Sequence, residues 1–459
     1  MSARNLLVIV TAALVSVICY HRSVHTRYAG LLADCMGTIS SLYIEPVSQR
    51  ELFEGAMEGM TRRLDQYSGY IDPDSYSQLH ESLDQEFGGV GIMVEIDRET
   101  NRLTVFSPLV DTPAHRAGLR PGDIILEIDG EDTTDFSLKD AVQRMRGQPD
   151  TQVTLKVSHV GVEDPEEVQL TREIIPVKSV YGDTRNEDGS WRFVLHYAPR
   201  VGYVQLKTFG ENSAQELQDA ILPLHGRIDG LILDLRGNAG GLLTSAVEVC
   251  DLFIEQGSIV STQGRNGRVD ETFEARADDE IVDANLPLAV VVDHYSASAS
   301  EILAACLQDH RRAQIVGQRT WGKGTVQNVI ELEGGRSALK LTTATYWRPS
   351  GKNIHRLSTA TDEDDWGVTP DDGYEVVLEK EDFERTQRER RAREVLPSTA
   401  QEETDWASHA SQNGADKNDA AEGDEEAKPS RGSAPFDPQL QKAIEYIDSQ
   451  VHPPMLEAA

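Results

Sequence analysis

A short apolar run, a turn of small residues and a helix follow one another in the second half of this chain, and this feature constrains its fold most. Residues 288–292 are all apolar and predict a buried strand. Residues 293–301 then read Asp-His-Tyr-Ser-Ala-Ser-Ala-Ser-Glu, and residues 302–307 predict a helix. Small residues let a substrate carbonyl approach, and the N–H groups at a helix N-terminus favour developing negative charge. The segment therefore suits a nucleophile, and its serines are the candidates.

A serine hydroxyl is a poor nucleophile and needs a neighbouring base. A second segment, residues 319–327, reads Arg-Thr-Trp-Gly-Lys-Gly-Thr-Val-Gln and carries one lysine between two glycines. Lys323 can act as a base only when it is neutral, and an ordinary lysine pKa of about 10.4 requires burial to lower it. Each segment alone also fits a structural turn, but the two together favour a catalytic pair.

The two segments together resemble those of the carboxy-terminal processing, or tail-specific, serine proteases. Matched residue by residue, the resemblance implies that Ser298 is the nucleophile, Lys323 the base and Gln327 the residue that orients the lysine. Lys323 follows Ser298 by 25 residues, which fits the family pattern. His294 and Tyr295 depart from it, because an acidic residue and a glycine are more common there. The resemblance implies peptide hydrolysis through an acyl-enzyme, with no metal or cofactor.

A predicted strand and a glycine loop supply candidates for an oxyanion hole. Residues 230–235 predict a buried strand, and residues 237–241 read Gly-Asn-Ala-Gly-Gly. A double glycine can bring a backbone N–H close to an oxyanion. The resemblance implies that one N–H of this loop, from Gly240 or Gly241, acts together with the N–H of Ala299. We favour Gly240, and a simple helix-entry turn is the alternative.

Residues from about 85 to 160 resemble a PDZ domain. Residues 87–92 read Phe-Gly-Gly-Val-Gly-Ile and open a strand, and a Pro-Ala-His-Arg-Ala-Gly-Leu-Arg-Pro-Gly-Asp block follows at 113–123. Backbone N–H groups of a glycine loop can hold a terminal carboxylate while the peptide adds to the sheet as a strand. A closed groove with a purely structural role is the alternative. The resemblance implies that the peptide-binding residues are Gly89, Val90, Gly91, Ile92 and Arg146. In some relatives, the residue at the position of Arg146 links this module to the active site.

The N-terminal region predicts export from the cytoplasm. Arg4 precedes an apolar run from Leu6 to Tyr20, which is typical of a signal sequence. As a helix this run spans about 22 Å, which is shorter than the ~30 Å hydrocarbon core and favours a signal peptide. Residues 21–25, His-Arg-Ser-Val-His, offer no small-residue cleavage site, which favours an uncleaved anchor. In either case we expect a periplasmic enzyme, held at the cytoplasmic membrane by this segment if it is retained.

Length, charge and cysteine content limit the remaining choices. A chain of 459 residues is too long for one typical domain. Its net charge of −33 disfavours nucleic acid as a partner, because a phosphate-binding surface needs a basic patch. The sequence contains no metal-binding spacing such as HExxH or paired CxxC, so we expect no metal site. The four cysteines predict no disulfide framework.

We expect a multidomain α/β protein. Apolar strands that alternate with helices favour a mixed sheet covered by helices, and the resemblance implies a protease core of the ClpP/crotonase-like type. The N-terminal helices are expected to pack on the protein or to form a homodimer. The expected segments are a signal sequence or anchor at 1–25, a helical region at 26–83, the PDZ domain at 84–160, the protease core at 161–383, a disordered acidic segment at 384–434 and a helix that packs on the core at 435–459.

The predicted function is that of an extracytoplasmic serine endopeptidase that cleaves proteins or peptides near free, apolar C-termini, with the PDZ domain presenting or gating the substrate. Two alternatives stay open. A Ser-His-Asp triad would use His294 or His310 as its base, but it leaves the lysine and glutamine motif unexplained. A non-catalytic PDZ scaffold protein on a protease fold would have no reason to keep Ser298, Lys323 and Gln327 together.

Overall fold

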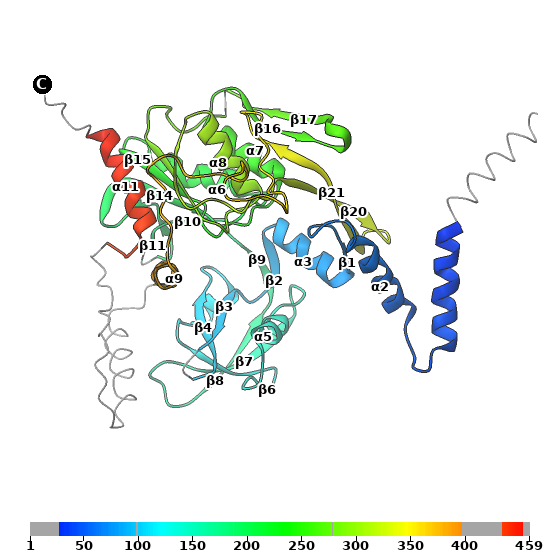
Figure 1. Cartoon of the computed structure of the whole chain (residues 1–459). Helices are drawn as coiled ribbons and strands as arrows, with labels where there is room; N and C mark the ends of the chain where they lie inside the picture. Colours follow the sequence, from blue (N-terminus) through cyan, green and yellow to red (C-terminus); the bar gives the residue numbers. More distant parts are fainter. Residues whose placement is uncertain (1–26, 98–99, 187, 278, 397–433, 453–459) are drawn as a thin grey trace, which may run out of the picture. The chain divides into compact units, whose positions relative to one another are not determined.

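The computed structural model describes residues 27–97, 100–186, 188–277, 279–396 and 434–452 (Figure 1). The apolar run of residues 6–20 lies outside these residues, and so does the greater part of the predicted acidic segment. Across the part that is described, no helix is both long enough and apolar enough to cross a membrane. The chain divides into two compact units, one formed by residues 1–77 with 327–343 and the other by residues 78–326 with 344–459.

The first unit begins with two helices, at residues 27–42 and at α2 (Gln49–Thr61). A capping box precedes α2. The backbone N–H of Ser48 donates to Oε2 of Glu51 at 2.9 Å, and the N–H of Glu51 donates to Oγ of Ser48 at 3.1 Å. These two bonds satisfy N–H groups that a helix start otherwise leaves without partners.

Strands of the first unit come from both of its sequence segments. Strand β1 (Gly69–Ile71) pairs antiparallel with the beginning of β21 (Ser337–Trp347), with Gly69 opposite Lys340. Strand β20 (Thr325–Leu332) precedes β21 in the chain, and helix α3 (Pro73–Leu83) follows β1. Residues 327–343, which include parts of β20 and β21, therefore belong to the same compact unit as the N-terminal helices. They lie 250 or more positions after β1 in the chain.

The predicted PDZ region forms an antiparallel sheet with strand order β3-β4-β5-β7-β8 and with β6 beside β5. Strand β3 stands at one edge of this sheet, as the binding of an added peptide strand requires. Strands β2 (Glu86–Gly89) and β9 (Glu173–Pro176) pair with each other. The remaining elements are β3 (Ile92–Ile96), β4 (Leu103–Pro108), α4 (Pro113–Arg116), β5 (Ile124–Ile128), β6 (Glu131–Asp132), α5 (Leu138–Met145), β7 (Gln152–Ser158) and β8 (Glu166–Thr171).

The predicted protease core is built on a second sheet, with strand order β10-β14-β15-β18-β19 and with β13 beside β14. Strands β14, β15, β18 and β19 run parallel, whereas β10 and β13 are antiparallel to β14. Parallel strands are buried on both faces, which explains their continuous apolar sequences. The strand bounds are β10 (Val180–Tyr181), β13 (Val194–Leu195), β14 (Ala198–Leu206), β15 (Gly230–Asp234), β18 (Leu288–Val292) and β19 (Gln314–Gly317).

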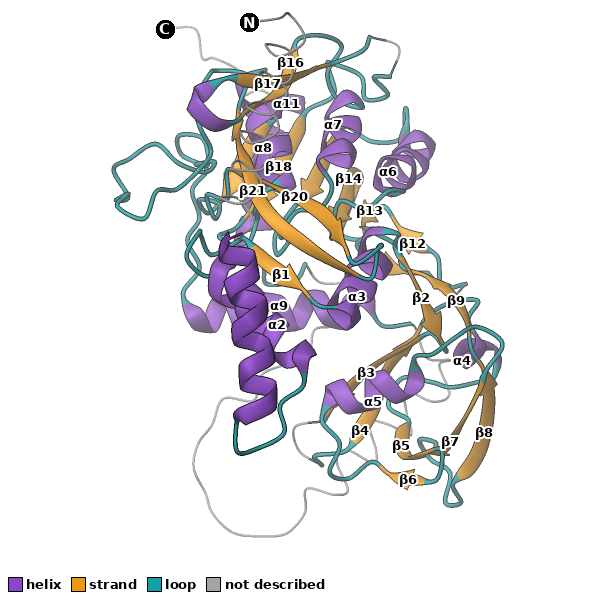
Figure 2. Cartoon of the chain, turned by 90° about the vertical axis from the view of Figure 1, so that its right-hand side faces the viewer, coloured by secondary structure: helices purple, strands orange, loops and turns teal. Residues whose placement is uncertain are grey.

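Helices cover both faces of this sheet (Figures 1 and 2). Helices α6 (Ser213–Ile221), α7 (Leu243–Asp251) and α8 (Ala299–Asp309) share one buried cluster with Leu233 of β15. The neighbouring Ile232 faces the other way and packs with α11 (Pro438–Val451). Helix α11 therefore packs on this face of the sheet.

The remaining elements of the second unit are short or lie outside the two main sheets. Strand β16 pairs antiparallel with β17 and also with the end of β21, where Ser261 stands opposite Trp347. Strands β11 and β12 form a separate two-stranded sheet. The bounds are β11 (Thr184–Arg185), β12 (Trp191–Arg192), η1 (Leu222–Leu224), β16 (Ser258–Gln263), η2 (Arg265–Gly267) and β17 (Val269–Glu274).

One boundary differs from the sequence prediction. The disordered segment is expected from residue 384, but helix α9 (Lys380–Glu394) includes the first part of it. The helix is highly polar, so hydrophobic periodicity does not reveal it. Tertiary contacts hold it instead: Thr386 and Arg390 are buried, and Arg393 forms an ion pair of 2.6 Å with Asp183. The rest of the predicted segment lies outside the described residues.

Candidate active site

Ser298 stands at the junction of β18 and α8, as the sequence predicts. Its backbone has φ 58° and ψ −114°, a conformation that non-glycine residues rarely adopt. Such strain persists only where the surroundings fix it, and it is concentrated at functional sites. Only 7% of the residue is exposed. The turn therefore holds one serine in a strained position at the N-terminus of a buried helix.

The other two serines of the turn have structural hydrogen bonds. The Ser296 hydroxyl donates to the carbonyl of Leu235 at 2.9 Å, and the Ser300 hydroxyl donates to the carbonyl of Asn238 at 2.9 Å. Both residues are fully buried. Their hydroxyls tie the turn to the chain that leaves β15, so Ser298 is distinguished from its two neighbours.

The predicted glycine loop lies against the turn that carries Ser298. Gly240 has φ 101°, and a Cβ at this position would lie 2.8 Å from Cβ of Ser298 and 2.9 Å from N of Ala299. The backbone N–H of Ala297 donates to the carbonyl of Asn238 at 3.0 Å, which holds the two segments together. Glycine is therefore required at position 240 both by the backbone conformation and by the lack of space.

The two candidate oxyanion glycines differ in how their N–H groups are used. The N–H of Gly240 donates to Oδ1 of Asn238 at 2.8 Å. Gly241 forms a parallel bridge with Phe209, and this bridge uses the carbonyl of Gly240 and the N–H of Leu242. The N–H of Gly241 takes no part in that pairing. Ala299, the other predicted donor, is the first residue of α8, where helix N–H groups lack intrahelical partners.

Glu301 connects the serine turn to the lysine loop. Its Oε2 accepts hydrogen bonds from the backbone N–H groups of Ser298 and Lys323, both at 2.8 Å. Its Oε1 accepts from the N–H of Gly322 at 2.7 Å and from the hydroxyl of Thr320 at 2.6 Å. The residue is fully buried, and this burial raises the pKa of its carboxyl above the ordinary value while the four hydrogen bonds act in the opposite direction.

The sequence alone did not assign a structural role to Glu301. A signal existed, because glutamate three residues after a serine at a helix start is the spacing of a capping box. The bond from Ser298 N–H to the Glu301 carboxylate belongs to that arrangement. The contacts with residues 320–323 join two separate segments, and local spacing does not predict them.

A second residue without a predicted role is Tyr346, near the end of β21. Burial raises the pKa of its hydroxyl to about 12, and the side chain of Ser298 acts on that pKa in the opposite direction. Its backbone N–H donates to the carbonyl of Gly324 at 2.8 Å, next to Lys323 in the chain. Only 5% of the residue is exposed. Tyr346 is therefore a buried residue whose backbone holds the lysine loop.

Lys323 lies in the loop that joins β19 to β20, and Gln327 follows this loop. Lys323 is half-buried, and its backbone is fixed by Glu301. Gln327 lies on β20, and its side-chain amide donates to the hydroxyl of Thr342 at 3.3 Å. The residue belongs to the first of the two compact units. Its role in orienting the lysine stays a prediction.

The two histidines of the triad alternative occupy different surroundings. His310 follows the last residue of α8, about 18 Å along the helix from Ser298, and its Nε2 donates to the carbonyl of Ser258 at 2.8 Å. That distance excludes His310 as the base. The ring of His294 packs against those of Tyr295 and Phe383, with centroid distances of 3.7 and 6.4 Å.

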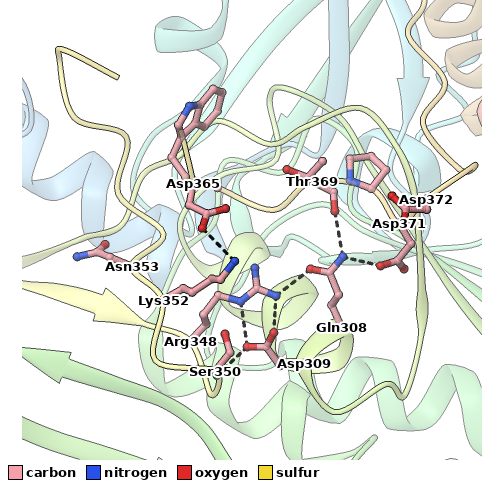
Figure 3. Close-up of a pocket in the computed structure, with 13 residues that line it drawn as sticks. Gln308, Asp309, Arg348, Ser350, Lys352, Asn353, Asp365, Thr369, Asp371 and Asp372 are labelled. Carbon is pink, nitrogen blue, oxygen red and sulfur yellow. Dashed lines mark hydrogen bonds and ion pairs between the residues drawn. The ribbon is translucent and has the colours of Figure 1, made fainter. Parts of the chain in front are cut away.

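A pocket of about 430 Å³ lies near the C-terminal end of α8, away from Ser298 (Figure 3). Four of its charged groups form two ion pairs. Arg348 forms an ion pair with Asp309 at 2.6 Å, and Lys352 forms one with Asp365 at 3.0 Å. Because Ser298 and Lys323 are not among its lining residues, this pocket is not the predicted active site.

The predicted peptide-binding loop of the PDZ region has a backbone that requires glycine. Gly91 has φ 75°, and a Cβ there would lie 2.3 Å from Cβ of Thr112. The loop is anchored by the N–H of Ala114, which donates to the carbonyl of Val90 at 3.0 Å. Gly89 ends β2, and Ile92 begins the edge strand β3, so the four predicted residues are contiguous at the sheet edge.

Arg146, the last predicted peptide-binding residue, follows helix α5. Its guanidinium forms an ion pair of 2.7 Å with Glu81 and lies 4.5 Å from the ring centroid of Phe87. These contacts connect it to α3 and β2. Its role in linking the PDZ region to the active site stays a prediction.

The chain is similar to known proteins. Residues 200–372 match peptidase family S41, and residues 107–158 match a PDZ domain. The carboxy-terminal-processing protease of Bartonella bacilliformis is 38% identical over 361 residues, which cover 75% of this chain and 77% of the relative. The corresponding protease of Synechocystis sp. is 38% identical over 323 residues, which cover 69% and 72% of the two chains. The solved photosystem II D1 C-terminal processing protease is 27% identical, covers 75% of this chain and 92% of its own, and gives a TM-score of 0.42.

The fold and the comparisons together define a serine protease with a PDZ domain. This chain belongs to the carboxy-terminal-processing proteases of peptidase family S41. The alternative of a non-catalytic PDZ scaffold protein on a protease fold is therefore not retained. As members of this family do, the enzyme acts on protein substrates.

Proposed function

We propose that this protease hydrolyses peptide bonds near the C-termini of its substrates through a dyad of Ser298 and Lys323. The observation that carries the proposal is the shared carboxylate of Glu301, whose Oε2 accepts the backbone N–H groups of both residues at 2.8 Å. One buried side chain thereby fixes the two backbones on which the dyad depends. The strained backbone of Ser298 supports the same assignment.

In the proposed reaction, neutral Nζ of Lys323 removes the proton from Oγ of Ser298. The Oγ attacks the substrate carbonyl carbon, and the carbonyl electron pair moves to its oxygen. When the C–N bond breaks, Lys323 gives its proton to the leaving amine. Water then attacks the acyl-enzyme, again with Lys323 as the base, and releases Ser298. Gln327 is proposed to orient the lysine, because its amide can hydrogen-bond to an amine without adding charge.

For the oxyanion hole we propose the N–H groups of Ala299 and Gly241. Gly240 is favoured from the sequence, but its N–H already donates to Asn238, whereas the bridge to Phe209 does not use the N–H of Gly241. Gly240 is then needed for its small size beside Ser298. Each oxyanion donor contributes roughly 3 kcal/mol to the stabilisation of the transition state.

The dyad is tested with a serine-directed acylating probe and with an unstructured protein substrate. We expect the wild-type protein to be labelled at Ser298 and to cleave the substrate. Ser298→Ala and Lys323→Ala should each abolish both labelling and cleavage. Lys323→Arg should be equally inactive because an arginine remains protonated. His294→Gln should stay active. Loss of labelling in His294→Gln with retention in Lys323→Ala would show that a histidine is the base.

We further propose that the PDZ region delivers substrates by their free, apolar C-termini. The edge position of β3 and the glycine loop before it support strand addition with capture of a terminal carboxylate. An unstructured substrate with an apolar free C-terminus should be cleaved faster than the same chain with an amidated or acidic end. Equal rates for free and amidated ends would contradict this mode of delivery.

The location of the enzyme is a separate proposal. The apolar run from Leu6 to Tyr20 behind Arg4 supports export and retention at the cytoplasmic membrane. Fractionation of cells that produce the full chain, with protease added to spheroplasts, tests this proposal. We expect the protein in the membrane fraction and accessible from the periplasmic side. Recovery of protease-resistant protein in the cytoplasm would overturn it. Sedimentation of the purified chain tests the expected homodimer.

A further inference from the structure

We propose that Trp366 is a positioning residue of this protease, whose indole ring holds the lysine loop, residues 318–324, in the conformation in which Lys323 serves Ser298. The inference rests on the proposed function, because it assumes that Lys323 is the base. It adds a residue that contacts neither the nucleophile nor the substrate and acts through the backbone of the loop.

The Trp366 ring is held by two arginines and a hydrogen bond. The Cζ atoms of Arg319 and Arg356 lie 3.6 and 4.3 Å from the ring centroid, and cations are attracted to the face of an aromatic ring. The indole N–H donates to the carbonyl of Thr361 at 2.9 Å. Only 8% of the residue is exposed. The ring therefore has a fixed position and too little exposed surface to bind a substrate side chain itself.

Arg319 joins the first half of the lysine loop to the segment that carries the ring. Its Nε donates to the carbonyl of Trp366 at 3.1 Å, and its Nη1 donates to the carbonyl of Asp362 at 2.8 Å. The donors of a guanidinium lie in its plane, which leaves its face to stack on an aromatic ring. The same group thus bonds to the backbone of residues 362–366 and lies over the indole.

Gly322 is in direct contact with the ring. A Cβ at this position would lie 2.9 Å from Cε3 of Trp366 and 2.7 Å from Cβ of Arg356, so only a glycine backbone fits there. The N–H of Gly322 donates to Oε1 of Glu301 at 2.7 Å, and the next N–H, that of Lys323, donates to Oε2 at 2.8 Å. One short stretch of backbone therefore contacts both the ring and the carboxylate.

Residues that follow Trp366 hold the other end of the loop through hydrogen bonds. The N–H of Val368 donates to Oγ1 of Thr320 at 2.7 Å, and the N–H of Thr320 donates to the carbonyl of Val368 at 3.1 Å. The hydroxyl of Thr320 donates to Oε1 of Glu301 at 2.6 Å. Because these bonds do not involve the indole ring, removal of the ring should loosen the loop around Gly322 and leave its attachment at Thr320 in place.

A positioning role predicts a specific effect on acylation. Without the ring, Gly322 loses its packing partner, and the N–H groups of Gly322 and Lys323 can move away from the carboxylate. A displacement of about 1 Å in a reacting group can lower a rate about a hundredfold. Because the ring does not contact the substrate, substrate affinity should not change. We therefore expect a slower reaction in molecules that all remain competent to react.

The experiment measures the saturating acylation rate and the substrate dissociation constant by stopped flow with an activated peptide ester. Intact-protein mass spectrometry gives the fraction of protein labelled at Ser298. For Trp366→Leu we expect an acylation rate lower by about ten- to hundred-fold, with full labelling and an unchanged dissociation constant. Trp366→Phe keeps an aromatic face for both guanidinium groups and should recover most of the rate, to about two- to fivefold below the wild type.

Trp191→Leu is the matched control. Trp191 also has an arginine over its ring, with Cζ of Arg185 at 3.6 Å from the centroid, and it stacks on Tyr181 with a centroid distance of 4.8 Å. It belongs to the separate two-stranded sheet of β11 and β12. This variant should lower Tm and keep the wild-type acylation rate.

The outcomes separate this inference from the proposed function. If the wild-type protein is not acylated at Ser298, or if Lys323→Ala is acylated at the wild-type rate, the proposed function fails and the inference fails with it. If both results support the dyad, but Trp366→Leu is acylated within about twofold of the wild-type rate, the inference about Trp366 fails alone.

Partial labelling of Trp366→Leu at the wild-type rate would also overturn the inference, because it indicates that a fraction of the molecules is unfolded. If Trp366→Leu does not fold, Trp366→Phe decides, since its smaller ring leaves space beside Gly322. Full labelling at a rate reduced by more than about twofold then supports the inference, and a rate closer to that of the wild type overturns it.

Discussion

The backbone N–H of Lys323 donates a hydrogen bond of 2.8 Å to the carboxylate of Glu301, and the oxygen that accepts it also accepts the N–H of Ser298. Ser298 and Lys323 come from separate segments. Ser298 immediately precedes α8, and Lys323 lies in the loop before β20. The relative position of their backbones thus depends on the side chain of Glu301. Small changes at Glu301 should therefore affect the proposed dyad.

Glu301→Gln keeps the volume of this side chain but replaces one acceptor oxygen with an NH₂ donor. That donor would face N–H or O–H groups that now bond to the carboxylate, and each buried donor left without a partner costs about 1–3 kcal/mol. We expect a lower Tm and at least a tenfold loss of kcat with an acylating substrate. A variant with wild-type kcat would show that the carboxylate does not position the dyad.

Ser300→Ala should separate structural from catalytic serines. The Ser300 hydroxyl donates to the carbonyl of Asn238, so its loss should reduce stability by about 1 kcal/mol and leave most of the activity. Ser298→Ala should retain stability and lose activity. Thermal unfolding and cleavage of an unstructured protein measure the two effects. An inactive Ser300→Ala beside an active Ser298→Ala would show that the register of the site is wrong.

Gly240→Ala tests the fit of the glycine loop against the nucleophile. The added methyl group would lie 2.8 Å from Cβ of Ser298, so the turn or the loop must shift. We expect a loss of kcat of at least a hundredfold, because displacement of the oxyanion donors removes transition-state stabilisation. Gly237→Ala is the control. Gly237 also has a positive φ, but a methyl group there meets no atom within 4 Å, so most activity should remain.

Asp437, at the start of α11, should determine how firmly this helix is held. Its carboxylate pairs with both terminal nitrogens of Arg236, at 2.7 and 2.9 Å, and Arg236 also pairs with Asp234. All three side chains are buried. Breaking a buried pair by removal of one partner costs about 3–5 kcal/mol. Asp437→Ala should therefore lower Tm strongly and increase proteolysis of α11. Asp448 is exposed on the same helix, so Asp448→Ala should change neither Tm nor proteolysis.

The same network predicts a pH dependence of stability. Burial opposes ionisation of Asp234, but Arg236 and Arg390 outweigh it and hold the pKa of that carboxyl well below its ordinary value of 3.8. Because the folded-state pKa is lowered, the stabilisation is present above pH 3.8 and is lost as pH falls below it. Unfolding measured from pH 6 to pH 2 should show this loss. Asp234→Asn should be less stable at pH 6 and should depend less on pH across that range.

The sequence by itself determined the elements whose signals are local. The apolar strand, small-residue turn and helix around Ser298 follow from patterns within about twenty residues, and so does the capping box of Ser48 and Glu51. The glycine loop at Gly240 also follows from its residue types. Backbone conformation and periodicity are decided over a few neighbouring residues, so a single sequence is enough to predict them.

Only the tertiary structure decided which of these segments meet, and through which atoms. Glu301 accepts a hydrogen bond from the backbone of Lys323, which lies 22 residues later in the chain. Arg236 pairs with Asp437, which lies 201 positions further on. The polar helix α9 is held by ion pairs instead of an apolar face. Each of these contacts depends on the packing of the whole core, because hydrogen bonds and ion pairs between distant segments have no periodicity that a sequence could display.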